Sequence, residues 1–109
     1  MPHIIVEYSK TLEPTIETTL IELHETLAAA GIDKMRIKTR GVALDHAVVG
    51  DQGVGGAMMH ATLLLLEGRD LTTKKQYGDP LYAAMNKNAP EGCAVTLEIR
   101  DMGKDTYFM

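Results

Sequence analysis

The chain has 109 residues, of which 45% are hydrophobic and 24% charged, a composition typical of one globular domain over residues 1–109. The net charge of −4 argues against nucleic-acid binding, which depends on a basic surface. Cys93 is the only cysteine, so an internal disulfide is excluded, and no set of metal ligands is evident. We expect a cytoplasmic protein, because there is no signal-peptide pattern and no apolar run of the roughly 18 to 20 residues that span a membrane.

The first half of the chain predicts a strand, a helix and a second strand. Residues 3–8 are rich in β-branched and aromatic side chains, which favour a strand. A helix is expected from about Pro14 to Gly31, since proline suits a first helical turn and glycine the position after the last. Its apolar residues recur every three or four positions, as one buried stripe requires: Ile16, Leu20, Leu23 and Leu27. Residues 36–44 are expected to form the second strand.

The second half predicts the same order after a glycine-rich turn at residues 50–56. Residues 57–66 are almost continuously apolar and are typical of a buried strand, with a helical segment as the alternative. His60 lies within this run and is interpreted as a core residue. Residues 93–100 alternate polar and apolar side chains, which indicates a half-buried strand.

A second helix is expected between these strands, from about Leu71 to Lys87, with Asp70 as its N-cap. Pro80 falls inside this stretch and has no N–H to donate, so we expect a kink or a break there. The alternative is a new turn capped by Asp79.

The order of elements predicts an α+β fold with a four-stranded mixed sheet and two helices on one face. Each strand–helix–strand unit should hold its two strands parallel. The units, about residues 2–48 and 57–101, look like structural copies in which Ala57 or Met58 takes the place of Pro2. The uncovered face of the sheet is a physical reason to expect an oligomer.

Four short motifs, in this order and with nearly gapless spacing, resemble the tautomerase superfamily. They are Pro2-His3-x-Ile5-Val6-Glu7 at the start, Ile37-x-Thr39-Arg40, His60-x-Thr62-Leu63 and Gly68-Arg69-x-Leu71. Within it the chain is similar to the 5-carboxymethyl-2-hydroxymuconate Δ-isomerases. This resemblance implies a homotrimer that uses no cofactor and ketonises a small anionic dienol with two or three carboxylates, in homoprotocatechuate breakdown.

Pro2 is the candidate catalytic residue. Tautomerisation moves a proton from an enol oxygen to a carbon, and it needs a base that is neutral at working pH. A proline amine freed by removal of Met1 meets this need where burial and cations disfavour its ammonium form. Many chains begin with Met-Pro for no catalytic reason, and a retained Met1 would make the nitrogen an amide that cannot act as a base.

Arg40, Lys38 and Arg69 are the candidate substrate-binding residues. Arg40 offers paired N–H donors to a carboxylate, and Lys38 alternates with it on one strand, so both point to the same face. Lys38 stands where the family usually has arginine, which keeps the charge but loses the planar fork. Arg69 either holds a carboxylate or pairs with Asp70 or a neighbouring subunit.

Two other functions stay open on the same scaffold. One is a different superfamily reaction, decarboxylation or hydration, in which Glu7 would activate water. The other is a trimeric domain that binds a small molecule without catalysis. The aromatic residues Tyr107 and Phe108 either wall the space around Pro2 or pack against a neighbouring subunit.

Overall fold

The structure, a computed structural model, describes residues 1–109 and contains four strands and two long helices. In chain order the elements are β1 (His3–Ser9), α1 (Glu13–Ala29), β2 (Lys38–Leu44), β3 (Met58–Leu66), α2 (Leu71–Asn88) and β4 (Ala94–Met102), with 3₁₀ turns at Lys10–Leu12, Lys34–Arg36 and Gly50–Gln52. Each expected element is present, although the second strand begins two residues later than predicted. Neither long helix is apolar enough to cross a membrane.

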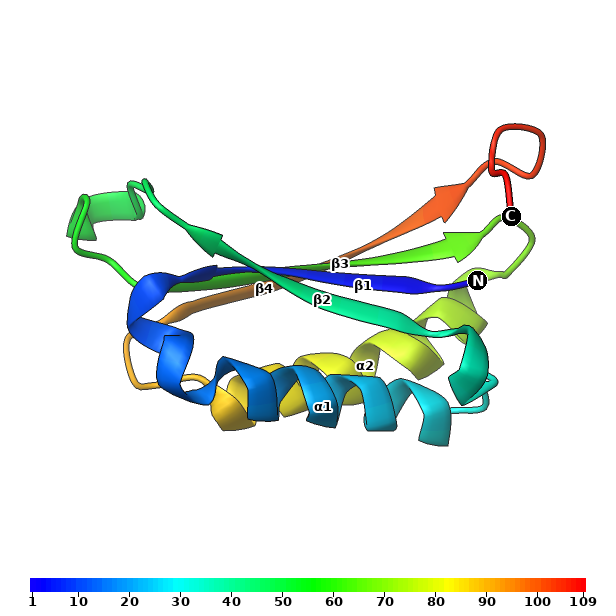
Figure 1. Ribbon diagram of the computed structural model, residues 1–109, viewed down its shortest axis with the longest axis horizontal. Helices are drawn as coiled ribbons and strands as arrows, with labels where there is room; N and C mark the ends of the chain where they lie inside the picture. The colour runs from blue at the N-terminus through cyan, green and yellow to red at the C-terminus, as the bar shows by residue number, and fades with distance from the viewer.

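The four strands form one mixed sheet in the order β2-β1-β3-β4. β1 and β2 are parallel, β3 and β4 are parallel, and the central pair β1 and β3 is antiparallel. Both helices cover the same face, as Figure 1 shows. The predicted α+β fold is therefore confirmed.

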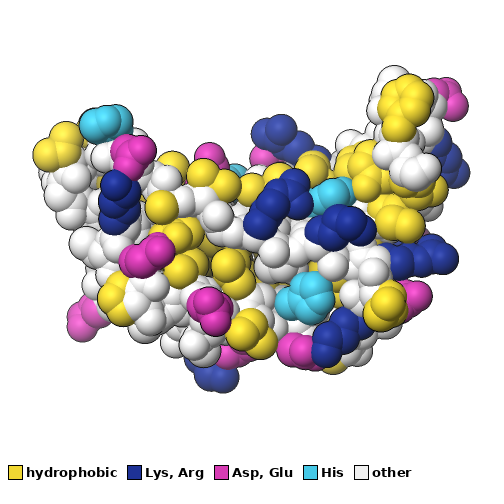
Figure 2. All heavy atoms as spheres, viewed as in Figure 1, with side chains coloured by type: hydrophobic (Ala, Val, Ile, Leu, Met, Phe, Trp, Pro, Cys, Tyr) yellow, Lys and Arg dark blue, Asp and Glu magenta, His cyan; other side chains and the backbone are white.

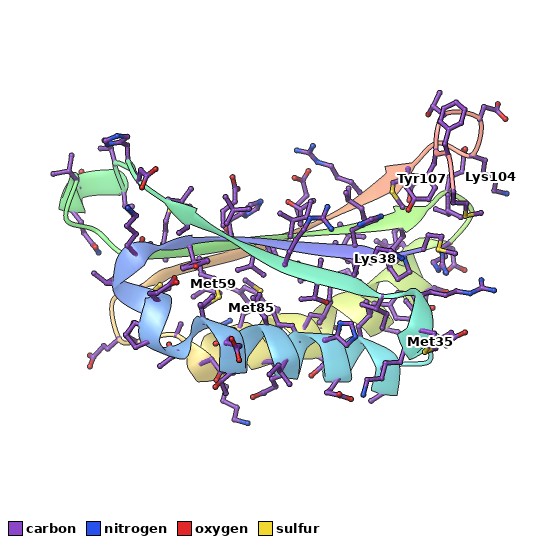
Figure 3. The ribbon with its side chains drawn as sticks, in the orientation of Figure 1. Met35, Lys38, Met59, Met85, Lys104 and Tyr107 are labelled. Atoms are coloured by element: carbon purple, nitrogen blue, oxygen red, sulfur yellow. The ribbon has the colours of Figure 1, made fainter.

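The core lies between the sheet and the helices. Side chains alternate along a strand, so every second residue of β1 and β3 faces the helices. These strand residues meet the apolar stripes of α1 and α2, and Met59 and Met85, both labelled in Figure 3, lie in this layer. The residues that are at most 1% exposed include Ile4, Val6, Leu23, Leu27, Met59, Leu63, Leu65, Leu81 and Met85.

Helix α2 continues through Pro80, so the predicted break is wrong. Proline in a helix interior costs about 3 kcal/mol. Leu81 and Met85 are almost fully buried on this helix, and each such side chain contributes about 1.5–3 kcal/mol, so their packing offsets that cost. Pro80 itself is exposed, so water can reach the backbone carbonyl four residues earlier, which has no N–H partner in the helix. The expected N-cap is confirmed, because Asp70 accepts a 2.9 Å hydrogen bond from the Thr73 N–H.

The face without helices is lined by the alternate strand residues and is flanked by two raised segments. Figure 1 shows the loop that follows β2 and the C-terminal segment rising from opposite ends on this side. His60 lies on this face, half-buried, with its Nδ1 2.7 Å from Thr96 Oγ1. Its interpretation as a core residue is therefore wrong, because β3 presents its odd-numbered residues to the helices.

Candidate active site

Pro2 lies at the end of the sheet, immediately before β1. It is buried, and its carbonyl oxygen accepts a 3.1 Å hydrogen bond from the Lys38 N–H. This bond extends the parallel pairing of β1 and β2 by one step, so the position of Pro2 is set by the sheet. Its nitrogen is an amide while Met1 precedes it, and the amino group of the chain then belongs to Met1.

Three cations surround this amino group. Arg36 ends the 3₁₀ turn before β2, Lys38 begins β2, and Arg69 lies in the loop after β3. Burial, and then the charges of Arg36, Arg69 and Lys38, lower the pKa of the Met1 amine from its usual value. Figure 2 shows several Lys and Arg side chains gathered, with a histidine beside them, on the half of the molecule that holds the N-terminus. This end of the sheet therefore favours an uncharged amine and attracts anions.

Arg40 lies on β2, two residues after Lys38. Its Nη1 is 3.0 Å from Nδ1 of His3, and its side chain makes no ion pair with a carboxylate. An arginine side chain only donates hydrogen bonds, so Nδ1 of His3 must be the acceptor. Burial, and then the charges of Arg40, Lys38 and the amino terminus, lower the pKa of His3, which favours the neutral form of its ring.

Arg69 is held by the loop between β3 and α2. Its Nη1 donates a 3.2 Å hydrogen bond to the carbonyl oxygen of Leu66, and its guanidinium lies 5.9 Å from the centre of the Tyr77 ring. It forms no ion pair with Asp70, whose carboxylate caps α2 instead. The charge of Arg69 therefore remains without a carboxylate partner in the chain.

Two further residues, Arg36 and His3, join the site, and Tyr107 enters it as a hydrogen-bond partner rather than as a wall around Pro2. Arg36 belongs to the alternating series that includes Lys38 and Arg40, and this spacing was a signal that could have found it. His3 and Tyr107 meet through a 2.7 Å hydrogen bond between residues 104 positions apart, which no local pattern indicates. Figure 3 places the labelled Lys38 and Tyr107 at the same end of the molecule, from β2 and the C-terminal segment.

The other residues considered lie outside this cluster. Phe108 is 91% exposed and walls no space around Pro2 within the chain. Glu7 is exposed near the middle of the sheet, opposite His60. The surface cavities lie elsewhere, and the largest, about 370 Å³, is formed by α2 and β4. A single chain therefore presents the cations around Pro2 on an open surface.

Comparison with known proteins agrees with this geometry. The family described as 5-carboxymethyl-2-hydroxymuconate isomerase matches residues 2–108. Among solved structures, a 5-carboxymethyl-2-hydroxymuconate isomerase from Deinococcus radiodurans R1 has a TM-score of 0.88 and 26% identity, covering 99% of this chain and 87% of that one. A macrophage migration inhibitory factor-like protein from Entamoeba histolytica has a TM-score of 0.72 and 16% identity, covering 99% and 94%. A search of curated protein sequences gives no significant match.

The doubled β-α-β sheet, with a basic cluster at the amino end of β1, defines a protein of the tautomerase fold. A fused 4-OT described as a symmetric trimer shares this fold, with a TM-score of 0.77 and 19% identity over 98% of this chain and 90% of that one. The chain belongs to the 5-carboxymethyl-2-hydroxymuconate isomerase family. Membership of this family supports an isomerase.

Proposed function

We propose that this protein is a cofactor-independent isomerase that ketonises a dienol with two or three carboxylates, such as 5-carboxymethyl-2-hydroxymuconate. The Pro2 amine, freed by removal of Met1, is its general base and then its general acid. The observation that carries the proposal is the environment of the amino terminus, where burial and then the charges of Arg36, Arg69 and Lys38 lower the pKa of the Met1 amine, one residue before Pro2. Family membership supports the same reaction class.

The proton transfer balances without a further reactant. The neutral Pro2 nitrogen takes the proton of the substrate hydroxyl. The electrons of that O–H bond form the C=O bond of the ketone, and the carbon–carbon double bonds shift along the substrate. The resulting ammonium then returns one proton to a distal carbon. Such a positioned acid–base group contributes about 10²- to 10⁴-fold to the rate. Desolvation helps because it disfavours the charged amine before substrate binds.

The cations have a second role in this proposal. Arg40, Lys38 and Arg69 hold the substrate carboxylates, and whichever of them lies near the reacting oxygen stabilises the charge that develops there. None of the three forms an ion pair with a carboxylate in the chain. The chain therefore keeps their charge available for a ligand.

We infer further that the working form is a homotrimer. The helix-free face carries half-buried apolar residues, namely Ile5, Leu64 and Leu66, which burial between subunits would cover. The open surface around Pro2 would be closed in the same way. A protein of this fold described as a symmetric trimer supports the inference. Light scattering tests it by giving the molar mass in solution.

The decisive experiment measures ketonisation by ultraviolet absorbance on protein whose N-terminus has been verified by mass spectrometry. The substrates are 5-carboxymethyl-2-hydroxymuconate and 2-hydroxymuconate. Protein without Met1 is expected to be active, and a preparation that retains Met1 is expected to lose about 10²- to 10⁴-fold in kcat/KM. Full activity from a protein with intact Met1 would exclude the Pro2 amine as the base.

A further inference from the structure

The C-terminal segment returns to the beginning of the chain and contacts the candidate site. The hydroxyl oxygen of Tyr107 lies 2.7 Å from Nε2 of His3, and the two rings meet edge to face with their centres 5.8 Å apart. The segment is also tied to the loop after β3, since the backbone N–H of Lys104 donates a 2.6 Å hydrogen bond to Glu67 Oε2. Figure 3 shows Tyr107 and Lys104 together in this raised segment.

The direction of each hydrogen bond in this chain follows from Arg40. Its guanidinium donates to Nδ1 of His3, so the one hydrogen of the neutral ring is on Nε2. That N–H therefore donates to the hydroxyl oxygen of Tyr107. Arg40, His3 and Tyr107 are thus joined by two hydrogen bonds, and both of these bonds favour the Nε2–H tautomer of His3.

Arg40 is held by a neutral acceptor, the His3 imidazole, and not by a carboxylate. On the same face, Arg100 lies 3.0 Å from Glu98, an ion pair that satisfies its charge. Arg40 has His3 as its only hydrogen-bond partner and keeps its full positive charge. The imidazole thus restricts a long, exposed side chain while leaving its other N–H groups free for an anion.

We propose that Tyr107 is a positioning residue for the candidate site: it holds His3 in the Nε2–H tautomer, and His3 in turn holds Arg40 ready for a substrate carboxylate. This inference rests on the proposed function for its substrate. It gives the C-terminal segment a role in anion binding, although Tyr107 touches neither Pro2 nor the reacting atoms.

The test is Tyr107→Phe, which keeps the ring and removes the hydroxyl oxygen. Tyr82→Phe is the matched control, because the Tyr82 hydroxyl likewise makes one hydrogen bond, which it donates over 3.1 Å to the Val95 carbonyl between α2 and β4. We expect Tyr107→Phe to raise KM for the dicarboxylate dienol about twofold to tenfold, the effect of one hydrogen bond, with kcat unchanged. Tyr82→Phe should leave both constants unchanged.

Two measurements separate positioning from general structure. In the Arg40→Ala background, Tyr107→Phe should have no further effect on KM, because the residue through which it acts is gone. The ¹⁵N chemical shifts of the His3 ring, assigned with His3→Gln, should show the Nε2–H tautomer in the unmodified protein and a mixture in Tyr107→Phe. An unchanged tautomer, or the same rise in KM in both backgrounds, overturns the proposal.

Adipate, a saturated dicarboxylate, makes the result independent of catalysis. Its dissociation constant, measured by calorimetry, should rise about twofold to tenfold in Tyr107→Phe and remain constant in Tyr82→Phe. If no dienol is converted, the proposed function fails, whereas this pattern of adipate binding would still support the positioning of Arg40. An unmodified protein that does not bind adipate, or equal binding by both variants, overturns the positioning role.

Discussion

Pro2 and Ala57 occupy equivalent places in the sheet. The carbonyl oxygen of Pro2 accepts a 3.1 Å hydrogen bond from the Lys38 N–H, and that of Ala57 accepts a 3.0 Å hydrogen bond from the Ala94 N–H. Each residue stands immediately before the first strand of a parallel pair. The cation at Lys38 is replaced by the small apolar Ala94 in the second pair, so the basic environment exists at only one of the two equivalent places.

Substitutions at these two positions test which nitrogen is the base. Pro2→Ala keeps a free, though primary, amine once Met1 is removed, so we expect part of the activity to remain, a loss smaller than the ~10²- to 10⁴-fold of a removed general base. Ala57→Pro should change kcat/KM less than twofold, because its nitrogen is an internal amide. Ketonisation kinetics check both, and a large loss in Ala57→Pro with the fold intact would place a second essential group at that end.

Lys38→Arg introduces a planar guanidinium at the first residue of β2. Arginine binds a carboxylate through two parallel N–H donors, whereas the lysine ammonium acts as a point charge. We expect KM for a dicarboxylate dienol to fall by about twofold to tenfold, the effect of roughly one further hydrogen bond, with little change in kcat. Lys75→Arg, on the outer surface of α2, is the control. A KM that stays constant in Lys38→Arg would indicate that Lys38 does not contact the substrate.

Arg36→Gln tests the electrostatic control of the base. After burial, its charge is the next cause that lowers the pKa of the Met1 amine, so we expect its removal to raise the pKa of the Pro2 amine that becomes the terminus. The base acts only when neutral, and activity therefore rises with pH through the amine pKa. We expect the acid limb of the kcat/KM profile to move to higher pH in Arg36→Gln, with the plateau at high pH retained. Arg100→Gln should leave the limb in place, since Arg100 is not among the charges that lower the pKa of the amino terminus.

The fold could be predicted further than the site. Apolar periodicity and the rule for parallel β-α-β units depend on local sequence. They were sufficient to predict that the two strands of each half are parallel and that both helices cover one face of the sheet. The contact between His3 and Tyr107 depends on where two distant segments end in space, and the sequence carries no period for it. Pro80 shows a third case, in which tertiary packing overrides a local rule.

The close approach of α2 and β4 at Gly78 leads to a prediction about stability. A Cβ at Gly78 would lie 2.9 Å from Ile99 Cδ1. Glycine inside a helix costs about 1 kcal/mol relative to alanine, whereas overpacking costs about 1–3 kcal/mol. Because the two terms oppose each other, we expect Gly78→Ala alone to lower the free energy of unfolding by about 1 kcal/mol.

Ile99→Val removes the methyl group that causes this clash. Alone it should cost about 0.5–1.5 kcal/mol, but in its presence Gly78→Ala should become stabilising by about 0.5–1 kcal/mol. Urea unfolding of the four proteins at one protein concentration measures the coupling, which should be about 1.5–2 kcal/mol. Additive effects would mean that the side chain of Ile99 moves aside freely, in which case helix propensity alone decides the outcome at Gly78.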